Sequence, residues 1–526
     1  MKKKKNTDAL ISIVIVGIIG LAGIVILYTQ GQQVGQAMLP LHTRGDQQLR
    51  YEYCELNSQT FPLGGTCRNL AEANCGPNTI IKMDYAAGCI KITQDLQGHQ
   101  LDIYGGSQGF YFTCNDNAII PPDGLAFGVQ VNGQATVKHC TVKDLSSGWG
   151  FQVVNSGRVE NSIAQDNERG FWVHGNNAQL PAKCLGCKAL SNDITGFKLE
   201  GYALAQADAF PCQSNNNGGY LNHPSGIGFE VTGYAHINHC TANANGNPAN
   251  EGSIGFKAGG NAILEDYLGA VGSYYGFYLD GNAKIQPAYA GAIGSAGNKI
   301  GYYVTGNAQI ISNYEITAAN NELYGFQFIS TAQGQTPKGQ GALVAYSYGG
   351  TEQEIGIYIK GNGAWVNAAN GLESHTNQVG IKVEGSGARL TGSGIACFNS
   401  QQDMIAQNGG EITGTWKTTD IQNLGGNVHN VNYIPCVDEP VCGNQVCEYW
   451  LGEKCYTCPG DCYSCDHWCH NGECDYNIGE SCANCVADCG QCGGGGGGGG
   501  GSPFMVKDIY GYPCINGNPN EGCPQI

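Results

Sequence analysis

A short alternating pattern of apolar and polar residues recurs along the middle of the chain. Its template is a glycine, a large apolar residue, any residue, an aliphatic residue, any residue, and a second glycine often followed by Asn-Ala. Residues 275–285 read YGFYLDGNAKI and residues 300–310 read IGYYVTGNAQI. The leading glycines lie 20 to 32 residues apart, at Gly128, Gly150, Gly170, Gly196, Gly228, Gly255, Gly276, Gly301, Gly325, Gly356 and Gly380.

Each repeat predicts two short β-strands joined by a bend. Phe277 and Leu279 fall on one face and Tyr278 on the other, which is the period-two pattern of a half-buried strand. Gly281 permits a sharp bend, after which residues 283–285 resume the inward alternation. A unit of about 25 residues with no helical period is too small to bury its own apolar side, so neighbouring units must stack.

Stacking predicts columns of equivalent side chains. Parallel coils about 4.8 Å apart place Phe277 over Tyr302 and Leu279 over Val304. A glycine-rich tract of low complexity would keep no register between glycine and aliphatic columns, and β-propeller blades run about 40 residues or more. The inward column is expected to contain Phe151, Phe171, Phe197, Phe229, Phe256 and Phe277.

The repeats carry a family resemblance. Residues 76–434 resemble the right-handed parallel β-helix superfamily, which includes pectate lyases and periplasmic or surface β-helix repeat proteins. IKITQDLQGHQLDIYG at 90–105 is similar to the first coil of many such proteins. The resemblance implies an all-β, right-handed parallel β-helix solenoid of about eleven or more coils. These motifs specify architecture well and activity poorly.

The outward positions of the aligned strands predict a surface. One column contains Trp172, Lys198, Glu230, Lys257, Tyr278 and Tyr303, continuing through Gln327 and Tyr358 to Lys382. Aromatic faces flanked by hydrogen-bonding groups suit sugars, so the first six residues are the predicted glycan-binding site. In a second column His174 neighbours Glu200, and a histidine near a carboxylate suits general acid/base catalysis. The alternative is a solvated strand face in which Lys198 and Lys257 bracket Glu230.

The catalytic motifs of the superfamily do not transfer. Its enzymes use paired aspartates for hydrolysis, or calcium-binding acids with a basic residue for elimination. The chain has no Asn-Thr-Asp, Gly-His-Gly or Arg-Ile-Lys set, and it contains six arginines in all. His174 and Glu200 are therefore the only catalytic candidates, and no activity is carried over.

The N-terminus predicts export. MKKKK precedes residues 9–28, a run of twenty residues without a charge, which is long enough to span a bilayer with the lysines on the cytoplasmic side. An apolar run of twenty residues is longer than the roughly 7 to 15 residues usual in a signal peptide, which favours an uncleaved anchor. The alternative is a cleaved signal peptide with Gly35-Gln36-Ala37 as its cleavage site, in which case the protein is secreted.

Cysteine spacing predicts two small modules near the C-terminus. Twelve of the 26 cysteines follow C-x4-C-x7-C-x2-C-x3-C-x2-C twice, offset by 27 residues. A segment this short cannot build a sufficient core, and an exported chain meets oxidising conditions, so disulfides are favoured over zinc. The units resemble the CGNGxCExGExCxxCPxDC repeats of bacterial and archaeal surface proteins. The cysteines are Cys442, Cys447, Cys455, Cys458, Cys462, Cys465, Cys469, Cys474, Cys482, Cys485, Cys489 and Cys492.

Acidic residues repeat with these cysteines. Oxygen-rich clusters in a rigid loop can hold calcium, and calcium is the one cofactor that the sequence raises. The alternative is that solvated acids keep a small module soluble. The calcium candidates are Glu448, Glu453, Asp461, Asp475, Glu480 and Asp488.

The charge of the chain restricts the kind of partner that it can bind. The 526 residues carry a formal net charge of −17, and no basic stripe appears beyond the first five residues, which argues against a nucleic-acid partner. The predicted organisation is a cytoplasmic segment at 1–8, an anchor at 9–28, a linker and Cys-containing cap at 29–75, the β-helix at 76–434, two six-cysteine repeats at 435–492, a glycine linker at 493–502 and a tail at 503–526.

These features predict a membrane-anchored, cell-surface β-helix protein for adhesion or recognition, with a polysaccharide or surface glycan as its partner. A polysaccharide lyase or glycoside hydrolase is one alternative, and a structural spacer that projects the cysteine modules is another. Some of the twelve cysteines between Cys54 and Cys436 are also expected to form disulfides.

Overall fold

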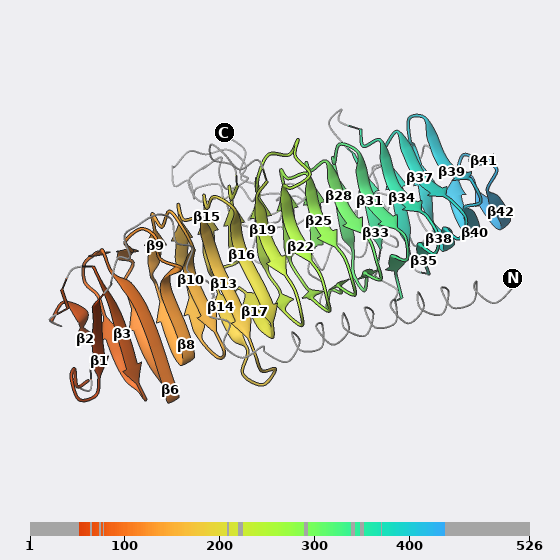
Figure 1. Cartoon of the computed structure of the whole chain (residues 1–526). Helices are drawn as coiled ribbons and strands as arrows, with labels where there is room; N and C mark the ends of the chain where they lie inside the picture. The colour runs from red at the N-terminus through yellow and green to blue at the C-terminus, as the bar shows by residue number, and fades with distance from the viewer. Residues whose placement is uncertain are drawn as a thin grey trace, which may run out of the picture. The chain divides into compact units, whose positions relative to one another are not determined.

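The computed structural model describes residues 52–436, apart from 64–65, 73–74, 77, 208–209, 219–224, 289–292, 338–341, 348–351 and 370. The described residues form a parallel β-solenoid of about 14 turns (Figure 1). Neighbouring turns pair strand on strand in parallel, from β1 with β3 at the beginning to β40 with β42 at the end. The all-β parallel solenoid predicted from the repeats is confirmed.

Each turn contributes strands to three faces. The first face carries the predicted outward column, and its strands pair in parallel along the whole solenoid. Its strands are β1 (Glu52–Asn57), β3 (Thr79–Tyr85), β6 (Gln100–Thr113), β8 (Phe127–Lys138), β10 (Trp149–Val154), β13 (Arg169–Gly175), β16 (Thr195–Gly201), β19 (Ile227–Val231), β22 (Ile254–Ala258), β25 (Tyr275–Leu279), β28 (Ile300–Val304), β31 (Tyr324–Ile329), β34 (Ile355–Lys360), β37 (Val379–Glu384), β39 (Gln402–Gln407) and β41 (Ile421–Leu424).

The second face follows the glycine bend. The long strands β6 and β8 run on into it. Its other strands are β2 (Arg68–Asn69), β4 (Gly88–Lys91), β11 (Arg158–Glu160), β14 (Ala182–Leu185), β17 (Ala203–Gln206), β20 (His236–Ile237), β23 (Ile263–Leu264), β26 (Lys284–Ile285), β29 (Gln309–Ile311), β32 (Gln333–Gln335), β35 (Trp365–Ala368), β38 (Arg389–Cys397), β40 (Glu411–Thr418) and β42 (Asn427–Ile434).

The third face closes each turn. Its last strand, β36, pairs with the second half of β38. A single 3₁₀ turn, η1 (Leu70–Glu72), lies near the start of the chain that the structure describes. The strands of the third face are β5 (Leu96–Gln97), β7 (Ala118–Ile120), β9 (Thr141–Lys143), β12 (Ile163–Gln165), β15 (Lys188–Leu190), β18 (Cys212–Asn215), β21 (Cys240–Asn243), β24 (Leu268–Val271), β27 (Ile293–Ala296), β30 (Ile316–Ala319), β33 (Leu343–Tyr346) and β36 (Leu372–His375).

The core contains the predicted aromatic column. The six phenylalanines from Phe151 to Phe277 are fully buried, and neighbouring rings stack with centroids 4.7 to 4.9 Å apart. Tyr302 and Phe326 extend the stack, with centroid distances of 4.7 and 4.6 Å. The register assigned from the sequence is therefore confirmed, because a slip of one residue would have turned every ring outward.

The leading glycine of each repeat allows two turns to approach closely. A Cβ atom added to Gly255 would lie 2.6 Å from the carbonyl oxygen of Gly276, and one added to Gly301 would lie 2.5 Å from that of Gly325. Only glycine fits these positions without moving the backbone. The bend predicted at Gly281 is also present, with φ of +66°, a conformation that glycine adopts at low cost.

A ladder of buried amide side chains runs along another corner of the solenoid. Asn192 Nδ2 donates to Asn217 Oδ1 at 2.8 Å, and Asn217 Nδ2 donates to Asn245 Oδ1 at 2.9 Å. Ser273 takes the next position, where its backbone N–H donates to Asn298 Oδ1 at 2.8 Å. The amides of this ladder are Asn167, Asn192, Asn217, Asn245, Asn298, Asn321, Gln353, Asn377 and Asn399.

Most of the disulfides link nearby turns, whereas Cys184–Cys187 joins two residues of the same turn. All twelve cysteines in the described part of the chain are paired, which confirms the expectation that some of them would be. Their sequence separations run from 3 to 39 residues. The pairs are Cys54–Cys75, Cys67–Cys89, Cys114–Cys140, Cys184–Cys187, Cys212–Cys240 and Cys397–Cys436.

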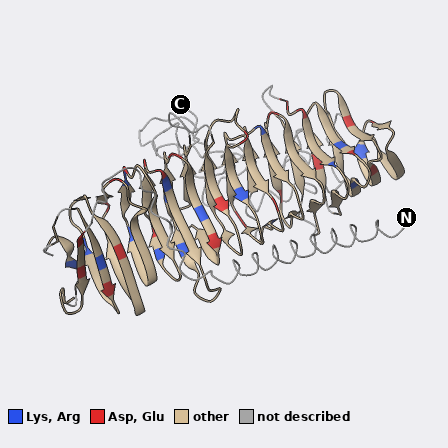
Figure 2. Cartoon of the chain, in the orientation of Figure 1, with Lys and Arg blue, Asp and Glu red and all other residues tan. Residues whose placement is uncertain are grey.

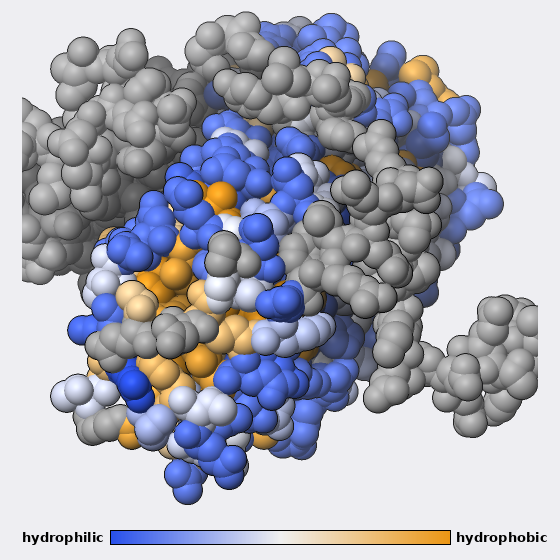
Figure 3. All heavy atoms as spheres, turned by 60° about the vertical axis from the view of Figure 1, so that its left-hand side comes forward, coloured by the Kyte–Doolittle hydropathy of each residue, from blue (hydrophilic) through white to orange (hydrophobic). Residues whose placement is uncertain are grey.

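The solenoid begins earlier than residue 76. Strand β1 lies within the predicted N-terminal cap and pairs in parallel with β3, so the sheet extends into that segment. Figure 3 shows apolar residues gathered at this end of the solenoid, surrounded by hydrophilic ones. Cys54, Leu63 and Cys75 are only partly buried against the core here. The apolar core is therefore less completely shielded from solvent at the first turn than at the turns that follow it.

Several predictions fall on residues 1–51 and 437–526, which lie outside the described residues. They concern the anchor at 9–28, the two six-cysteine repeats, the glycine linker and the tail. Among the residues that are described, no helix has the length and hydrophobicity needed to cross a bilayer.

Candidate functional site

The outward column occupies the predicted positions on the first face. Trp172 pairs with Lys198, and the next strands add Glu230, Lys257 and Tyr278 in register. The column then continues through Tyr303, Gln327, Tyr358 and Lys382. The six predicted glycan-binding side chains are all half-buried. The structure thus brings them onto one surface, in the predicted order.

The two catalytic candidates are neighbours, as the register predicts. Glu200 accepts hydrogen bonds from Trp172 Nε1 and from Lys198 Nζ, both at 2.8 Å, and His174 Nδ1 lies 3.9 Å from it. Burial raises the pKa of Glu200, but the hydrogen bonds from Lys198 and Trp172 and the charges of Lys198 and His174 outweigh burial and lower it. A general acid must hold its proton at the working pH. Glu200 is ionised and already bonded, which suits an ion-pair centre better than proton transfer.

Glu230 is paired on one side only. Lys257 Nζ lies 2.9 Å from its Oε1. Lys198 stands on its other side in register, but Lys198 makes its ion pair with Glu200. The expected arrangement, in which both lysines pair with Glu230, is therefore corrected to two separate ion pairs, Lys198 with Glu200 and Lys257 with Glu230. Figure 2 shows these charges alternating in sign on β16, β19 and β22, and becoming sparse on β25 and β28.

Beyond Lys257 the face becomes aromatic. The rings of Tyr278 and Tyr303 stack at a centroid distance of 5.0 Å, and Tyr275 packs edge-on against them at 5.4 and 5.3 Å. Tyr324 and Tyr358 form a second pair at 5.4 Å. These five residues are called the tyrosine face below. Burial raises the pKa of Tyr275 and Tyr358, so their phenols remain neutral hydrogen-bonding groups.

Tyr275 and Tyr324 were missed by the sequence reasoning. Each precedes the leading glycine of its repeat, and strict alternation from Phe277 would point Tyr275 inward. The burial pattern of β25 instead places both Gly276 and Phe277 in the interior and leaves Tyr275 half-exposed. The alternation therefore slips by one residue at the glycine. The signal in the sequence is a large residue before the leading glycine, which recurs as Trp149, Ile227 and Val379 on strands β10, β19 and β37 with the same burial pattern.

Gln327 lies in the middle of the tyrosine face. It stands between Tyr303 and Tyr358 in register, and it is only 8% exposed. Its amide oxygen is buried and has no hydrogen-bond partner within the described part of the chain. Leaving such a group unsatisfied costs about 1 to 3 kcal/mol. Gln327 therefore keeps an acceptor without a donor in the described residues, just below the surface of the tyrosine face.

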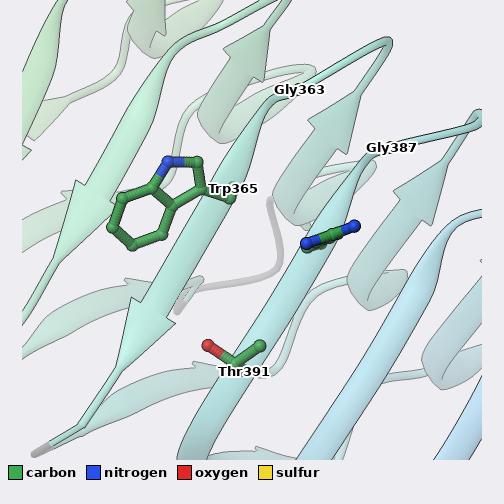
Figure 4. Close-up of a pocket in the computed structure, with 5 residues that line it drawn as sticks. Gly363, Trp365, Gly387 and Thr391 are labelled. Carbon is green, nitrogen blue, oxygen red and sulfur yellow. The ribbon is translucent and has the colours of Figure 1, made fainter.

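A separate pocket lies on the second face (Figure 4). Its volume is about 400 Å³, and Trp365, Arg389 and Thr391 line it together with Gly363 and Gly387. Trp365 on β35 and Arg389 on β38 are register partners. Arg389 is 62% exposed and its Nε lies 3.2 Å from Glu411 Oε2. The sequence reasoning did not find this pocket, because it assigned outward columns only to the first strand of each repeat.

The metal candidates lie elsewhere in the chain. Glu448, Glu453, Asp461, Asp475, Glu480 and Asp488 are outside the described residues, as are the twelve cysteines of the two repeats. Within residues 52–436, gaps excepted, no three His, Cys, Asp or Glu side chains are grouped so that they could hold a metal ion.

Comparison with known proteins adds no family. None of the protein-family models matches the chain, and no curated protein or solved structure is significantly similar to it.

Proposed function

We propose that this chain is an extracellular β-solenoid protein of the cell surface that binds polysaccharide on its first face, for adhesion or recognition. The single observation that carries the proposal is the tyrosine face, a set of aromatic rings on neighbouring strands of a stacked sheet. Four of its five rings are half-buried and open to a ligand, and the fifth, Tyr358, is buried. Aromatic rings offer apolar surface to the C–H faces of sugars, and the phenols and flanking amides offer hydrogen bonds to hydroxyls. A sheet holds these groups at fixed spacing, so little order has to be gained on binding.

Localisation outside the cell is supported by cysteine chemistry. Six disulfides among the described residues are typical of a protein that matures in an oxidising compartment. The charge-free run at 9–28 would anchor the protein in the membrane. The same proposal includes the resemblance of residues 76–434 to right-handed, pectate lyase-like β-helices and of the cysteine repeats to those of surface proteins. A membrane anchor would leave the solenoid exposed to polymers around the cell.

Binding is favoured over catalysis by the state of Glu200. Hydrogen bonds from Trp172 and Lys198, together with the charge of His174 at 3.9 Å, hold this carboxylate in its ionised form. Hydrolysis or elimination would require a group that can exchange a proton with the substrate. A lyase or hydrolase would need its acid elsewhere, and a pure spacer would need no aromatic face.

The test is a binding screen with the full-length protein, its disulfides intact, on an array of polysaccharides. We expect retention of at least one polymer without new reducing ends or unsaturated products. Replacing both Tyr278 and Tyr303 with alanine should weaken binding at least tenfold, since each ring contributes on the order of 1 kcal/mol.

A second stacked pair supplies the matched control. Tyr202 and Tyr234 lie outside the tyrosine face, with centroids 5.3 Å apart. Their double alanine variant should bind like the original protein. Equal losses in the two double variants would contradict a site on the first face, turnover would favour the enzyme, and a chain that retains no polymer would be a spacer.

A further inference from the structure

The tyrosine face contains an acceptor that lacks a donor. Gln327 is a member of the outward column, and its buried amide oxygen has no partner in the described residues. Native proteins seldom leave such atoms unsatisfied unless a ligand or water uses them. Tyr303 and Tyr358 flank it in register, so a molecule on these rings lies directly over the amide, and a half-turn of the amide group about its last bond would bring the buried oxygen to that molecule. The missing donor is a hydroxyl or an amide N–H of that molecule.

The charges around the face disfavour an anionic ligand. Lys257 is 2.9 Å from Glu230 and Lys382 is 3.4 Å from Glu384, so the two lysines of the column that border the face are already paired. Glu384 also accepts the hydroxyl of Tyr358. A uronate would have to break these pairs or approach Lys360, an exposed lysine whose Nζ already lies over the Tyr358 ring, 5.8 Å from its centroid.

Carboxylates act on the tyrosines themselves. Burial raises the pKa of Tyr278 and of Tyr324. The negative charge of Asp280 raises the pKa of Tyr278 further. The negative charges of Glu354 and Glu384 do the same to the pKa of Tyr324. A polyanion would meet these negative charges beside Tyr278 and Tyr324, whereas a neutral chain would not be repelled by them.

We infer that the tyrosine face binds a neutral polysaccharide, and that a sugar hydroxyl or N-acetyl N–H donates to the amide oxygen of Gln327. This rests on the proposed function and adds its chemical class. The exposed Arg389 lies on the second face, so any attraction of uronates by that pocket is separate from the tyrosine face.

The experiment compares neutral and acidic polymers. Affinity electrophoresis of the full-length protein would use hydroxyethylcellulose, mannan and chitin oligosaccharides as neutral probes, and polygalacturonate and alginate as acidic ones. We expect retention by at least one neutral probe, with an affinity that hardly changes between low and high salt, because no ion pair is exchanged.

The decisive variant is Gln327→Met, which keeps the length of the side chain and removes the amide. It should weaken neutral-polymer binding about tenfold while leaving the melting temperature unchanged or higher, since an unsatisfied buried group is lost. A purely structural amide would give the opposite result, a lower melting temperature with unchanged binding. Gln152→Met is the control, because Gln152 lies in the same column on β10, between Gln130 and Trp172.

The outcomes separate the two proposals. Retention by acidic probes alone, lost when Tyr278 and Tyr303 become alanine, would keep the proposed function and overturn the neutral class. Neutral binding that Gln327→Met leaves unchanged would overturn the role of Gln327. If no probe on either side is retained, the proposed function fails, and this inference fails with it.

Discussion

At the scale of single residues, the burial of His375 makes stability depend on pH. The side chain is 7% exposed and its ring stacks on Tyr346 at a centroid distance of 5.6 Å. Burial lowers the pKa of His375 from 6.5 to about 4. Between these values the unfolded chain takes up a proton that the folded chain refuses, so the free energy of unfolding falls as the pH falls from 6.5 to 4.

We predict that His375→Phe removes this part of the pH dependence. The original protein should lose on the order of 3 kcal/mol more than the variant over that interval, because one pKa unit corresponds to about 1.36 kcal/mol. Urea denaturation at a series of pH values measures the difference. His429→Phe is the control, because His429 is 52% exposed. Parallel stability curves for the original protein and His375→Phe would refute the prediction.

Single residues also show where alternation is a sufficient guide. The phenylalanine column could be predicted because the inward positions of the first strand take large apolar side chains in these repeats, and the six rings recur at one place in the repeat. Tyr275 could not, because Gly276 has no side chain to mark the direction of the backbone, and the alternation slips there. Gln327 was placed in its column, but its unpartnered oxygen depends on the packing of tyrosines from other turns.

At the scale of elements, the amide ladder holds successive turns together. Asn217 Nδ2 donates to Asn245 Oδ1, to Ser214 Oγ and to Ala189 O, and its own oxygen accepts from Asn192. All five residues are buried. Removing one rung therefore leaves donors and acceptors unsatisfied on both sides of it.

We predict that Asn217→Ala lowers the free energy of unfolding by about 2 to 4 kcal/mol, since each orphaned buried group costs about 1 to 3 kcal/mol. Asn282, in one of the Gly-Asn-Ala bends, is exposed, and Asn282→Ala should change stability by less than about 0.5 kcal/mol. Denaturant titration of both variants gives the comparison. Similar losses at the two sites would mean that the ladder contributes no more than an exposed turn.

The ladder was outside the reach of the sequence reasoning. Asparagine is common in turns, so the buried asparagines of the ladder cannot be told by residue type from the exposed ones in the Gly-Asn-Ala bends. Their spacing follows the lengths of the loops between strands, which vary from turn to turn. Asn192 and Asn217 become equivalent only once the three faces are aligned. The alternation of inward and outward residues is a property of a single strand. The asparagine ladder instead depends on how the loops of a whole turn close onto the next turn.

At the scale of the whole molecule, the cysteines predict a redox response. The twelve paired cysteines between Cys54 and Cys436 should resist alkylation until a reductant is added. The twelve cysteines of the two repeats at 435–492 are expected to behave likewise. Thiol labelling with mass spectrometry, together with metal analysis, tests both groups. Free thiols that appear when a chelator removes zinc would overturn the disulfide assignment for the repeats.

The distribution of the disulfides has a mechanical consequence. Five bonds lie between Cys54 and Cys240, one joins Cys397 to Cys436, and none of the described cysteines falls between Cys240 and Cys397. Turns of a solenoid contact only their neighbours, so a chain under tension would unravel first in this unlinked stretch. Each turn of about 25 residues would release roughly 80 Å of contour length. Such a protein, tethered between a cell and a polymer, would lengthen in its middle and absorb a sudden load while both of its linked ends kept their folds.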